Sequence, residues 1–382
     1  MKIFILTIVV FILFSFIAIL VSSCTKMGVK PDKKSISDLS FSDNYNIDKK
    51  QFQNRRPELV DDMRKRLMNF TSIMKFLFAD KPDDTKPKNL PVIKPDFVDF
   101  MNTNDQIKAI WLGHSSFILN ISGKVILVDP VFSTSASPVN FMVKRFIEPV
   151  AKLEDLPDVD VILISHDHYD HLDMEVVKFY KDKDNIFITP LGIGSYLKGW
   201  GITDDRIFET DWWGTVSYNG LNFVATPAQH FSGRGLSSNV TLWASWIIQK
   251  GKSKIFYSGD SGYDIHFKQI GNMFGPFDVA FIECGQYNEK WREVHMLPEE
   301  SIMAFEDLNA RKLFPVHWGM FELSSHSWNE PIMKVYEASI AKNFELVAPM
   351  IGEVVNLENT YEVTKWWEVP SLATEEELII QR

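Results

Sequence analysis

The chain has little cysteine and no concentration of positive charge. Only two of its 382 residues are cysteine, Cys24 and Cys284, and no intramolecular disulfide is possible if Cys24 is modified. The formal net charge is −10 and no basic stripe is present, which argues against nucleic acid as a partner. Cys284 has no neighbour that would activate it, so we expect a buried, inert thiol. Stability must come mainly from an apolar core, and a hydrophobic content of 45% is enough for a large one.

The N-terminus carries a targeting segment. Residues 3–20 are almost wholly apolar, and Val21, Ser22 and Ser23 then lead into Cys24. This pattern resembles the lipobox of a bacterial lipoprotein signal, in which residues 1–23 are removed and Cys24 is lipidated. An uncleaved transmembrane anchor and a plain secretory signal are the alternatives. All three place the folded part outside the cytoplasm, and the first predicts a lipid-anchored protein of the bacterial cell envelope, facing the periplasm or the exterior.

The rest of the chain divides by composition. Residues 24–105 read as a tether and a helical extension, because residues 25–52 are polar and residues 57–78 have the apolar spacing of an amphipathic helix that packs on the main domain. The main domain is predicted over residues 106–360, and residues 361–382 are expected to be a tail.

Within the main domain, short apolar runs predict strands, and longer periodic runs between them predict helices. Strands are expected at 108–112, 116–121, 124–128, 159–164, 185–189, 221–225, 242–249, 254–257 and 279–282, and helices at 174–182 and 298–309. Asp173 is placed to cap the first helix, and Pro298 to start the second. A meander of strands followed by alternating strands and helices predicts an α/β fold with two sheets between layers of helices.

The most informative segment follows the strand predicted at 159–164. Residues 166–171 have the sequence His-Asp-His-Tyr-Asp-His, which packs three imidazoles and two carboxylates into six positions. Imidazole and carboxylate are ligands that suit Zn²⁺. A catalytic zinc usually takes three protein ligands, so four candidates this close together predict two metals in one site.

Further candidate ligands occur where other strands end. They share a position directly after an apolar run, where the sheet fixes the side chain and the loop admits substrate. They are Asp129, His230, Asp260 and His317.

The order of these residues resembles the metallo-β-lactamase superfamily. The sequence motifs around them resemble those of the N-acyl-phosphatidylethanolamine-hydrolysing phospholipase D family, over residues 55–355. These motifs are WLGHSS (111–116), VDPVF (128–132), SASP (135–138), TPAQHFS (226–232), LWASW (242–246), GDSGY (259–263), His295 before PEE (298–300), and PVHWG (315–319).

The resemblance implies an αββα sandwich of two mixed sheets and a di-zinc site. His166, His168 and His230 would bind one zinc, Asp170, His171 and His317 the other, and Asp260 both. A hydroxide bridging the metals would attack phosphorus, so that Asp170 and Asp260 serve catalysis as ligands. Iron or manganese are alternative metals, although five histidines favour zinc.

Other polar residues have weaker support. Asp129 is expected to accept a hydrogen bond from a ligand histidine, and the alternative is a turn-forming Asp before proline. His114 is a second candidate for such a supporting role, or a buried structural histidine. His295 is expected to contact the substrate phosphate or the leaving group, or else to be a surface residue; His266 and His326 are expected at the surface. The segment at Glu283 and Cys284 departs from the family.

The sequence leads to three functional hypotheses. The first is a phosphodiesterase of phospholipase D type that acts on N-acyl-phosphatidylethanolamine or a similar lipid diester, with the membrane as a partner through the lipid anchor. The second is a lactonase or amidase that uses the same site on a carbonyl group. The third is a non-catalytic metal-binding envelope protein.

Overall fold

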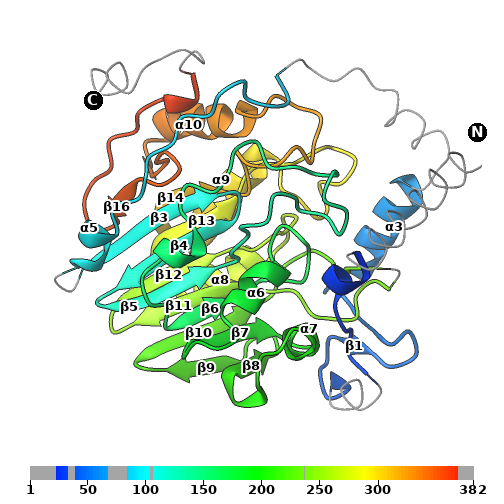
Figure 1. Cartoon of the computed structure of the whole chain (residues 1–382). Helices are drawn as coiled ribbons and strands as arrows, with labels where there is room; N and C mark the ends of the chain where they lie inside the picture. Colours follow the sequence, from blue (N-terminus) through cyan, green and yellow to red (C-terminus); the bar gives the residue numbers. More distant parts are fainter. Residues whose placement is uncertain (1–22, 33–38, 68–83, 104–105, 236, 369–382) are drawn as a thin grey trace, which may run out of the picture.

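Two seven-stranded sheets lie face to face between layers of helices (Figure 1). The computed structural model describes residues 23–32, 39–67, 84–103, 106–235 and 237–368. Within them both sheets are mixed, with antiparallel and parallel pairs. The predicted αββα sandwich is therefore confirmed.

The first sheet has the strand order β16-β3-β4-β5-β6-β7-β8. Its strands β3, β4 and β5 form an antiparallel meander, and β5 to β8 pair in parallel. The helices α6 and α7 make connections between the parallel strands, as parallel pairing requires. The bounds are β3 Ile107–Gly113, β4 Ser116–Ile121, β5 Lys124–Val128, β6 Val161–Leu163, α6 Met174–Phe179, β7 Ile186–Pro190, α7 Gly194–Gly199, β8 Ile207–Thr210 and β16 Val354–Asn356.

The second sheet has the order β15-β14-β13-β12-β11-β10-β9. Strands β9 to β12 pair antiparallel and β12 to β15 pair in parallel, with the helices α8, α9 and α10 between the later strands. The bounds are β9 Thr215–Tyr218, β10 Leu221–Thr226, β11 Ser245–Lys250, β12 Ser253–Tyr257, α8 His266–Phe274, β13 Phe277–Glu283, α9 Pro298–Asp307, β14 Ala310–Val316, α10 Glu330–Lys342 and β15 Glu345–Leu346.

Alternating side chains explain how each sheet is buried on both faces. On β4, Phe117 and Leu119 belong to the core between the sheets, whereas Ile118 between them packs in a second cluster with residues of α6 and α7. The same alternation holds on β5, where Val128 faces the sheet core and Leu127 the helices. Strand side chains point to opposite faces with period two, so nearly every position of these central strands must be apolar.

Segments outside the predicted main domain contribute to the same core. Tyr45 and Phe52, in the two-residue strands β1 (Tyr45–Asn46) and β2 (Gln51–Phe52), are buried in it. Trp366 and Trp367, beyond residue 360, are also buried there, in a short 3-10 turn (Trp366–Glu368). The folded unit thus includes parts of both flanking segments.

The helix α3 (Pro57–Leu67) coincides with the first half of the amphipathic helix predicted over 57–78, and the second half lies outside the described residues. Its buried side chains Val60 and Met63 pack with Val294. The expectation that this helix packs on the domain is confirmed. A further short helix, α5 (Phe97–Met101), precedes β3. None of the helices in the described ranges is long and apolar enough to cross a membrane.

Candidate metal centre

The predicted ligands gather along one edge of the two sheets. They follow strands whose carboxyl ends meet there: β5 for Asp129, β6 for residues 166–171, β10 for His230, β12 for Asp260 and β14 for His317. The turn before Asp260 approaches the first sheet closely. Gly259 has φ +56°, and a Cβ there would lie 2.9 Å from Ser165 Cβ, so this position requires glycine.

The first group of donors consists of His166, His168, His230 and Asp260. His168 Nδ1 lies 2.9 Å from His166 Nε2 and 3.2 Å from His230 Nε2. Asp260 Oδ2 lies 3.7 Å from Nε2 of both His166 and His230. Four donor atoms from four separate loop positions therefore converge on one point.

The second group consists of Asp170, His171, His317 and His114. Asp170 Oδ2 lies 3.8 Å from His171 Nε2 and 3.9 Å from His317 Nε2. Asp260 Oδ2 is also 3.2 Å from His171 Nε2, so the same oxygen borders both groups. The structure thus brings together the seven residues that the sequence suggested as ligands, in the two sets in which the family pattern arranges them.

The donor atoms have the spacing that a zinc ion needs. Ligands at about 2.0–2.1 Å from a tetrahedral ion lie about 3.3 Å from one another, and the first group spans 2.9 to 3.7 Å. Nε2 of His171 and of His317 is buried with no hydrogen-bond partner among the described residues. Buried polar atoms without a partner are costly, so these nitrogens fit a bound metal.

Burial and neighbouring charges shift the pKa values of the site residues. Burial lowers the pKa of His166, His168 and His230, which leaves their imidazoles neutral and able to bind a metal. Burial would raise the pKa of Asp260, but His171 and His317 outweigh it and hold that pKa well below its ordinary value. Asp260 is therefore ionised, as a ligand carboxylate must be.

Hydrogen bonds fix how the histidines point. Asp129 Oδ2 lies 2.7 Å from His171 Nδ1, and the Val294 carbonyl oxygen 3.1 Å from His230 Nδ1. Asp260 Oδ1 lies 2.8 Å from His317 Nδ1. Each contact occupies Nδ1 and directs Nε2 into the site, which fixes the tautomer needed for metal binding. Asp129 thus has the position expected of it.

Asp129 is held in place by several donors. It is fully buried with φ +38°, accepts hydrogen bonds from the Ser165 backbone N–H at 2.7 Å and from the Tyr257 hydroxyl at 2.5 Å, and is also bonded by the Ser165 hydroxyl. Left-handed backbone is uncommon outside glycine, although Asp adopts it more readily than most residues. The site therefore depends on a strained turn that the surrounding bonds stabilise.

His114 contacts a candidate ligand. Its Nε2 lies 2.9 Å from Asp170 Oδ2, and its ring centroid is 4.1 Å from that of His317. Burial, followed by His317, lowers the pKa of His114 to about 3, so its ring is neutral. Its backbone N–H donates to the Trp318 carbonyl and its carbonyl accepts from the His317 N–H, which ties the two loops together. His114 is therefore a buried histidine in contact with a candidate ligand, and its supporting role stays a prediction.

The sequence did not identify the partner of His295. Glu283, the last residue of β13, is fully buried, and its Oε2 lies 2.9 Å from His295 Nδ1. Its Oε1 accepts from the backbone N–H of Met296 at 2.8 Å. The signal was present, because an acidic residue ended a strand at the edge that carries the ligands. His295 itself lies between ligand rings, with centroids 5.1 Å from both His230 and His317.

The expectation that His266 lies at the surface is wrong. His266 is 1% exposed at the start of α8, and burial lowers its pKa to about 3. Its Nε2 lies 3.3 Å from the Ser261 hydroxyl, so it packs as a neutral structural histidine. His326 is partly buried, and its ring stacks on Tyr287 with centroids 4.4 Å apart. Cys284 is buried with a raised pKa, because burial disfavours the thiolate, which agrees with the expected inert role.

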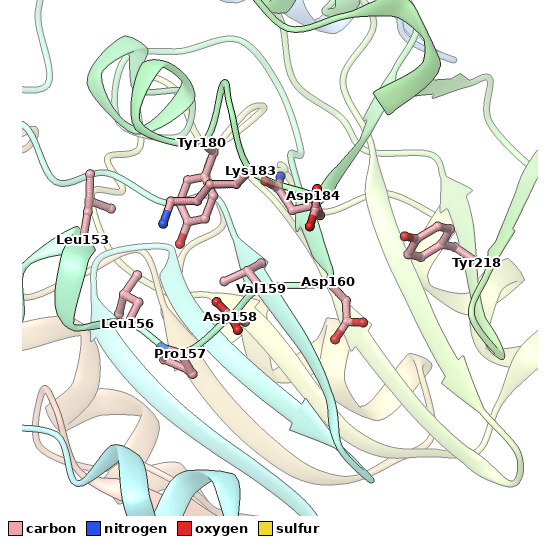
Figure 2. A pocket seen from close by; sticks show the side chains of 11 residues that line it. Leu153, Leu156, Pro157, Asp158, Val159, Asp160, Tyr180, Lys183, Asp184 and Tyr218 are labelled. Carbon is pink, nitrogen blue, oxygen red and sulfur yellow. The ribbon is translucent and has the colours of Figure 1, made fainter.

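The side of the site open to solvent is the one where its more exposed side chains lie. Side chains of Asp170 and His295 are 14% and 16% exposed, whereas those of His171 and His317 are at most 1%. A separate cleft of about 420 Å³ lies at the other ends of the strands, lined by residues such as Asp160 and Tyr180 (Figure 2). Asp160 immediately precedes β6, whereas the ligands follow β6, so this cleft is not part of the metal centre.

Comparison with known proteins agrees with this geometry. Residues 124–318 match the family model of the β-lactamase superfamily domain. An uncharacterized protein of Mycobacterium tuberculosis is 38% identical over 285 residues, which cover 73% of this chain and 76% of that protein. The N-acyl-phosphatidylethanolamine-hydrolyzing phospholipase D 1 of Caenorhabditis elegans is 31% identical over 309 residues, or 74% of this chain and 87% of the relative.

Two further similarities concern the fold and a shorter segment. The structure of a metallo hydrolase from Ignicoccus hospitalis has a TM-score of 0.51 at 22% identity and covers 68% of this chain and 100% of that one. The outer membrane protein RomA of Klebsiella pneumoniae is 55% identical over 99 residues, which are 26% of this chain and 75% of RomA.

Proposed function

The chain belongs to the β-lactamase superfamily and is a metal-dependent hydrolase, and from that premise we propose that it is a di-zinc phosphodiesterase of phospholipase D type. Its substrate would be N-acyl-phosphatidylethanolamine or a similar lipid diester. The observation that carries the proposal is the convergence of seven buried or half-buried His and Asp side chains in two groups that share Asp260 Oδ2.

We assign the ligands by these groups. His166, His168 and His230 would hold one zinc, and Asp170, His171 and His317 the other, with Asp260 between them. We assign His114 to hold Asp170 in place. Its Nε2 lies next to Asp170 Oδ2, and a neutral imidazole can donate a hydrogen bond to that oxygen. When bound, the zinc pair supplies a water of lowered pKa and a positive field for the phosphoryl oxygens.

The protein's own groups would complete the reaction. Water adds to phosphorus, and the P–O bond to the head-group alcohol breaks, which releases phosphatidic acid. His295 lies partly exposed beside the candidate ligands, so its Nε2 is the group placed to contact the phosphate or the leaving oxygen. Glu283 would hold the ring in that orientation through Nδ1.

The lipid substrate and the location have separate support. Two curated relatives are named for hydrolysis of N-acyl-phosphatidylethanolamine, the C. elegans protein and a mitochondrial yeast protein that is 36% identical over 237 residues. RomA is named as an outer membrane protein. Together with the lipobox-like segment that ends at Cys24, these names favour a lipid-anchored envelope enzyme whose substrate lies in the same membrane.

The test compares substrates and variants. The full chain, purified in detergent, is assayed on N-acyl-phosphatidylethanolamine, bis(p-nitrophenyl) phosphate and a panel of lactones. We expect cleavage of both diesters and loss of that activity in the double variant His168→Ala/Asp170→Ala. Diesterase activity that survives in the double variant, or turnover of lactones alone, would contradict the proposal.

A further inference from the structure

A loop beside the N-terminal segment exposes large apolar side chains. Residues 134–146, which we call the anchor-side loop, lie between β5 and β6, and at its tip Phe141 is 68% and Met142 51% exposed. The loop is not loosely attached. Its two sides are joined by an isolated β-bridge between Ser135 and Lys144 and by a hydrogen bond from the Arg145 N–H to the Thr134 carbonyl. These contacts across the loop therefore hold the apolar tip in a defined position.

The start of the described chain lies against this loop. Lys26, two residues after Cys24, donates from Nζ to Asn140 Oδ1 in this loop. Asn140 is the neighbour of Phe141 in the chain. Cys24, which would begin the lipidated chain, is therefore close to the tip.

The same N-terminal segment is also bound to the domain. Arg234 Nη2 donates to the Lys26 carbonyl at 2.8 Å, and Trp200 Nε1 donates to the Thr25 carbonyl at 3.2 Å. Arg234 is 3% exposed and lies over the ring of Tyr169 at 4.0 Å. These bonds give Cys24 one location relative to the loop, rather than the free range of a flexible tether.

The local charge differs from that of the whole chain. Lys26, Lys30 and Lys144 lie in residues 24–30 and in the loop, which themselves contain no Asp or Glu, although Glu148 follows the loop and the chain has a net charge of −10. Lys30 and Lys144 are exposed. An apolar tip with lysines beside it is the combination that binds an anionic bilayer surface, because the side chains enter the acyl region while ammonium groups meet the head groups.

We propose that the anchor-side loop inserts Phe141 and Met142 into the bilayer to which Cys24 is attached. The proposal rests on the lipid anchor of the proposed function, because an anchor at Cys24 brings a bilayer to this face and to no other. A lipid at Cys24 attaches the chain to the bilayer without fixing how the domain is turned, so a second contact next to the anchor would set the orientation of the domain.

That orientation has a consequence for the metal centre. The Phe146 N–H donates to the Met320 carbonyl at 2.8 Å, and the next residue, Phe321, packs its ring on His114 with centroids 5.1 Å apart. At the other end of the loop, Ser133 donates its backbone N–H to Asp173 at 2.7 Å, two residues after His171. The inserted loop therefore joins both ligand loops, and would bring the site to the membrane surface.

The test measures the depth of single side chains in proteoliposomes. The full chain carrying Met142→Cys, labelled with a thiol-reactive fluorophore, is reconstituted in vesicles of phosphatidylethanolamine and phosphatidylglycerol with brominated acyl chains. Cys284 is 1% exposed and Cys24 would be blocked by lipid, so the new thiol is the one that reacts. The matched control is Ile340→Cys, an apolar position on α10 that is 67% exposed, compared with 51% for Met142.

We expect quenching at position 142 by bromines near the head-group end of the chain, since interfacial side chains lie about 5–10 Å deep, and none at position 340. Adding Phe141→Ser to the labelled variant should weaken the quenching, and adding Met273→Ser should not. Equal quenching at the two positions, or none at position 142 in a membrane-bound chain, overturns the proposal. Label taken up by Cys24 in the unsubstituted chain shows that the anchor is absent and overturns it as well. None of these readouts depends on hydrolysis, so the loop and the phospholipase activity can fail separately.

Discussion

Glu283 Oε2 lies 2.9 Å from His295 Nδ1, and the carboxyl group is fully buried. Burial, reinforced by the charge of Asp260, raises the pKa of Glu283 well above its ordinary value. A buried carboxyl group is expensive unless hydrogen bonds satisfy it, and here His295, Met296 and Ser261 do so. We interpret Glu283 as the residue that positions His295.

Removing the contact between Glu283 and His295 should slow catalysis without loss of bound zinc. In Glu283→Ala the His295 ring can rotate, and we expect kcat to fall at least about tenfold, because a positioned acid or base contributes about 10²–10⁴-fold. Glu283→Gln, which keeps a hydrogen-bonding group at Oε2, should lose less. KM and zinc content should be nearly unchanged.

A control is Glu209→Gln, because Glu209 also accepts a hydrogen bond, from the Gly194 N–H at 2.8 Å, but lies exposed on β8 and away from the metal centre. Steady-state kinetics with bis(p-nitrophenyl) phosphate give the readout. If Glu283→Ala turns over as fast as the unsubstituted enzyme, Glu283 has no role in positioning.

His114→Ala should weaken one zinc site and spare the other. His114 touches Asp170 and no donor of the first group at hydrogen-bonding distance, and loss of a partner of a ligand typically costs about 10–100-fold in affinity. Competition with a chromophoric chelator would resolve a weak and a tight zinc. The control is His266→Ala, a buried histidine outside both groups, which should leave both affinities unchanged. Equal weakening of both sites by His114→Ala would show a general structural effect instead.

Removal of metal should lower stability as well as activity. A ligand present at 1,000 times its Kd stabilises a fold by about 4 kcal/mol, and for a domain of more than about 300 residues we expect Tm to fall by about 6 °C on chelation. Added zinc should restore both Tm and diesterase activity. Calorimetry with and without chelator measures the shift, and an unchanged Tm would mean that the clustered His and Asp side chains do not bind metal in the folded protein.

Arg234 should be important for stability. It donates to the carbonyl oxygens of Asp167 and Leu172 at 2.8 and 2.7 Å. Arg234→Met would leave these buried acceptors unpaired, at a cost of about 3 kcal/mol in the free energy of unfolding. Chemical denaturation would measure it, with Arg311→Met as control, since Arg311 forms an exposed ion pair with Asp278 worth at most about 1 kcal/mol. Similar losses in both variants would contradict this role of Arg234.

The fold was predictable where local patterns are strong. The runs 116–121 and 124–128 coincide with β4 and β5, because both are apolar and separated by a Ser-Gly turn. Strands β8 and β9 were not predicted, since they have half-buried or exposed positions and no apolar run. The prediction of a strand at 242–249 began three residues early, because residues 242–244 are as apolar and buried as the strand β11 but lie in a loop.

The sequence indicated which residues make up the candidate site, but not how their side chains are arranged in space. Strand ends and the spacing of residues 166–171 indicated the candidate ligands. The support network could not be seen, because it depends on contacts distant in sequence, such as Tyr257 with Asp129, and on left-handed backbone at His114 and His317. The surface expectation for His266 failed for a similar reason, since the side chain is buried by packing rather than by a local pattern.

The measurement that tests the account most directly is the zinc content of the purified full chain, made together with its hydrolysis of N-acyl-phosphatidylethanolamine. The account predicts two zinc ions per chain, with release of phosphatidic acid that stops on chelation and returns with zinc. A chain that binds no metal, or that binds two zinc ions and leaves phosphodiesters intact, would contradict it.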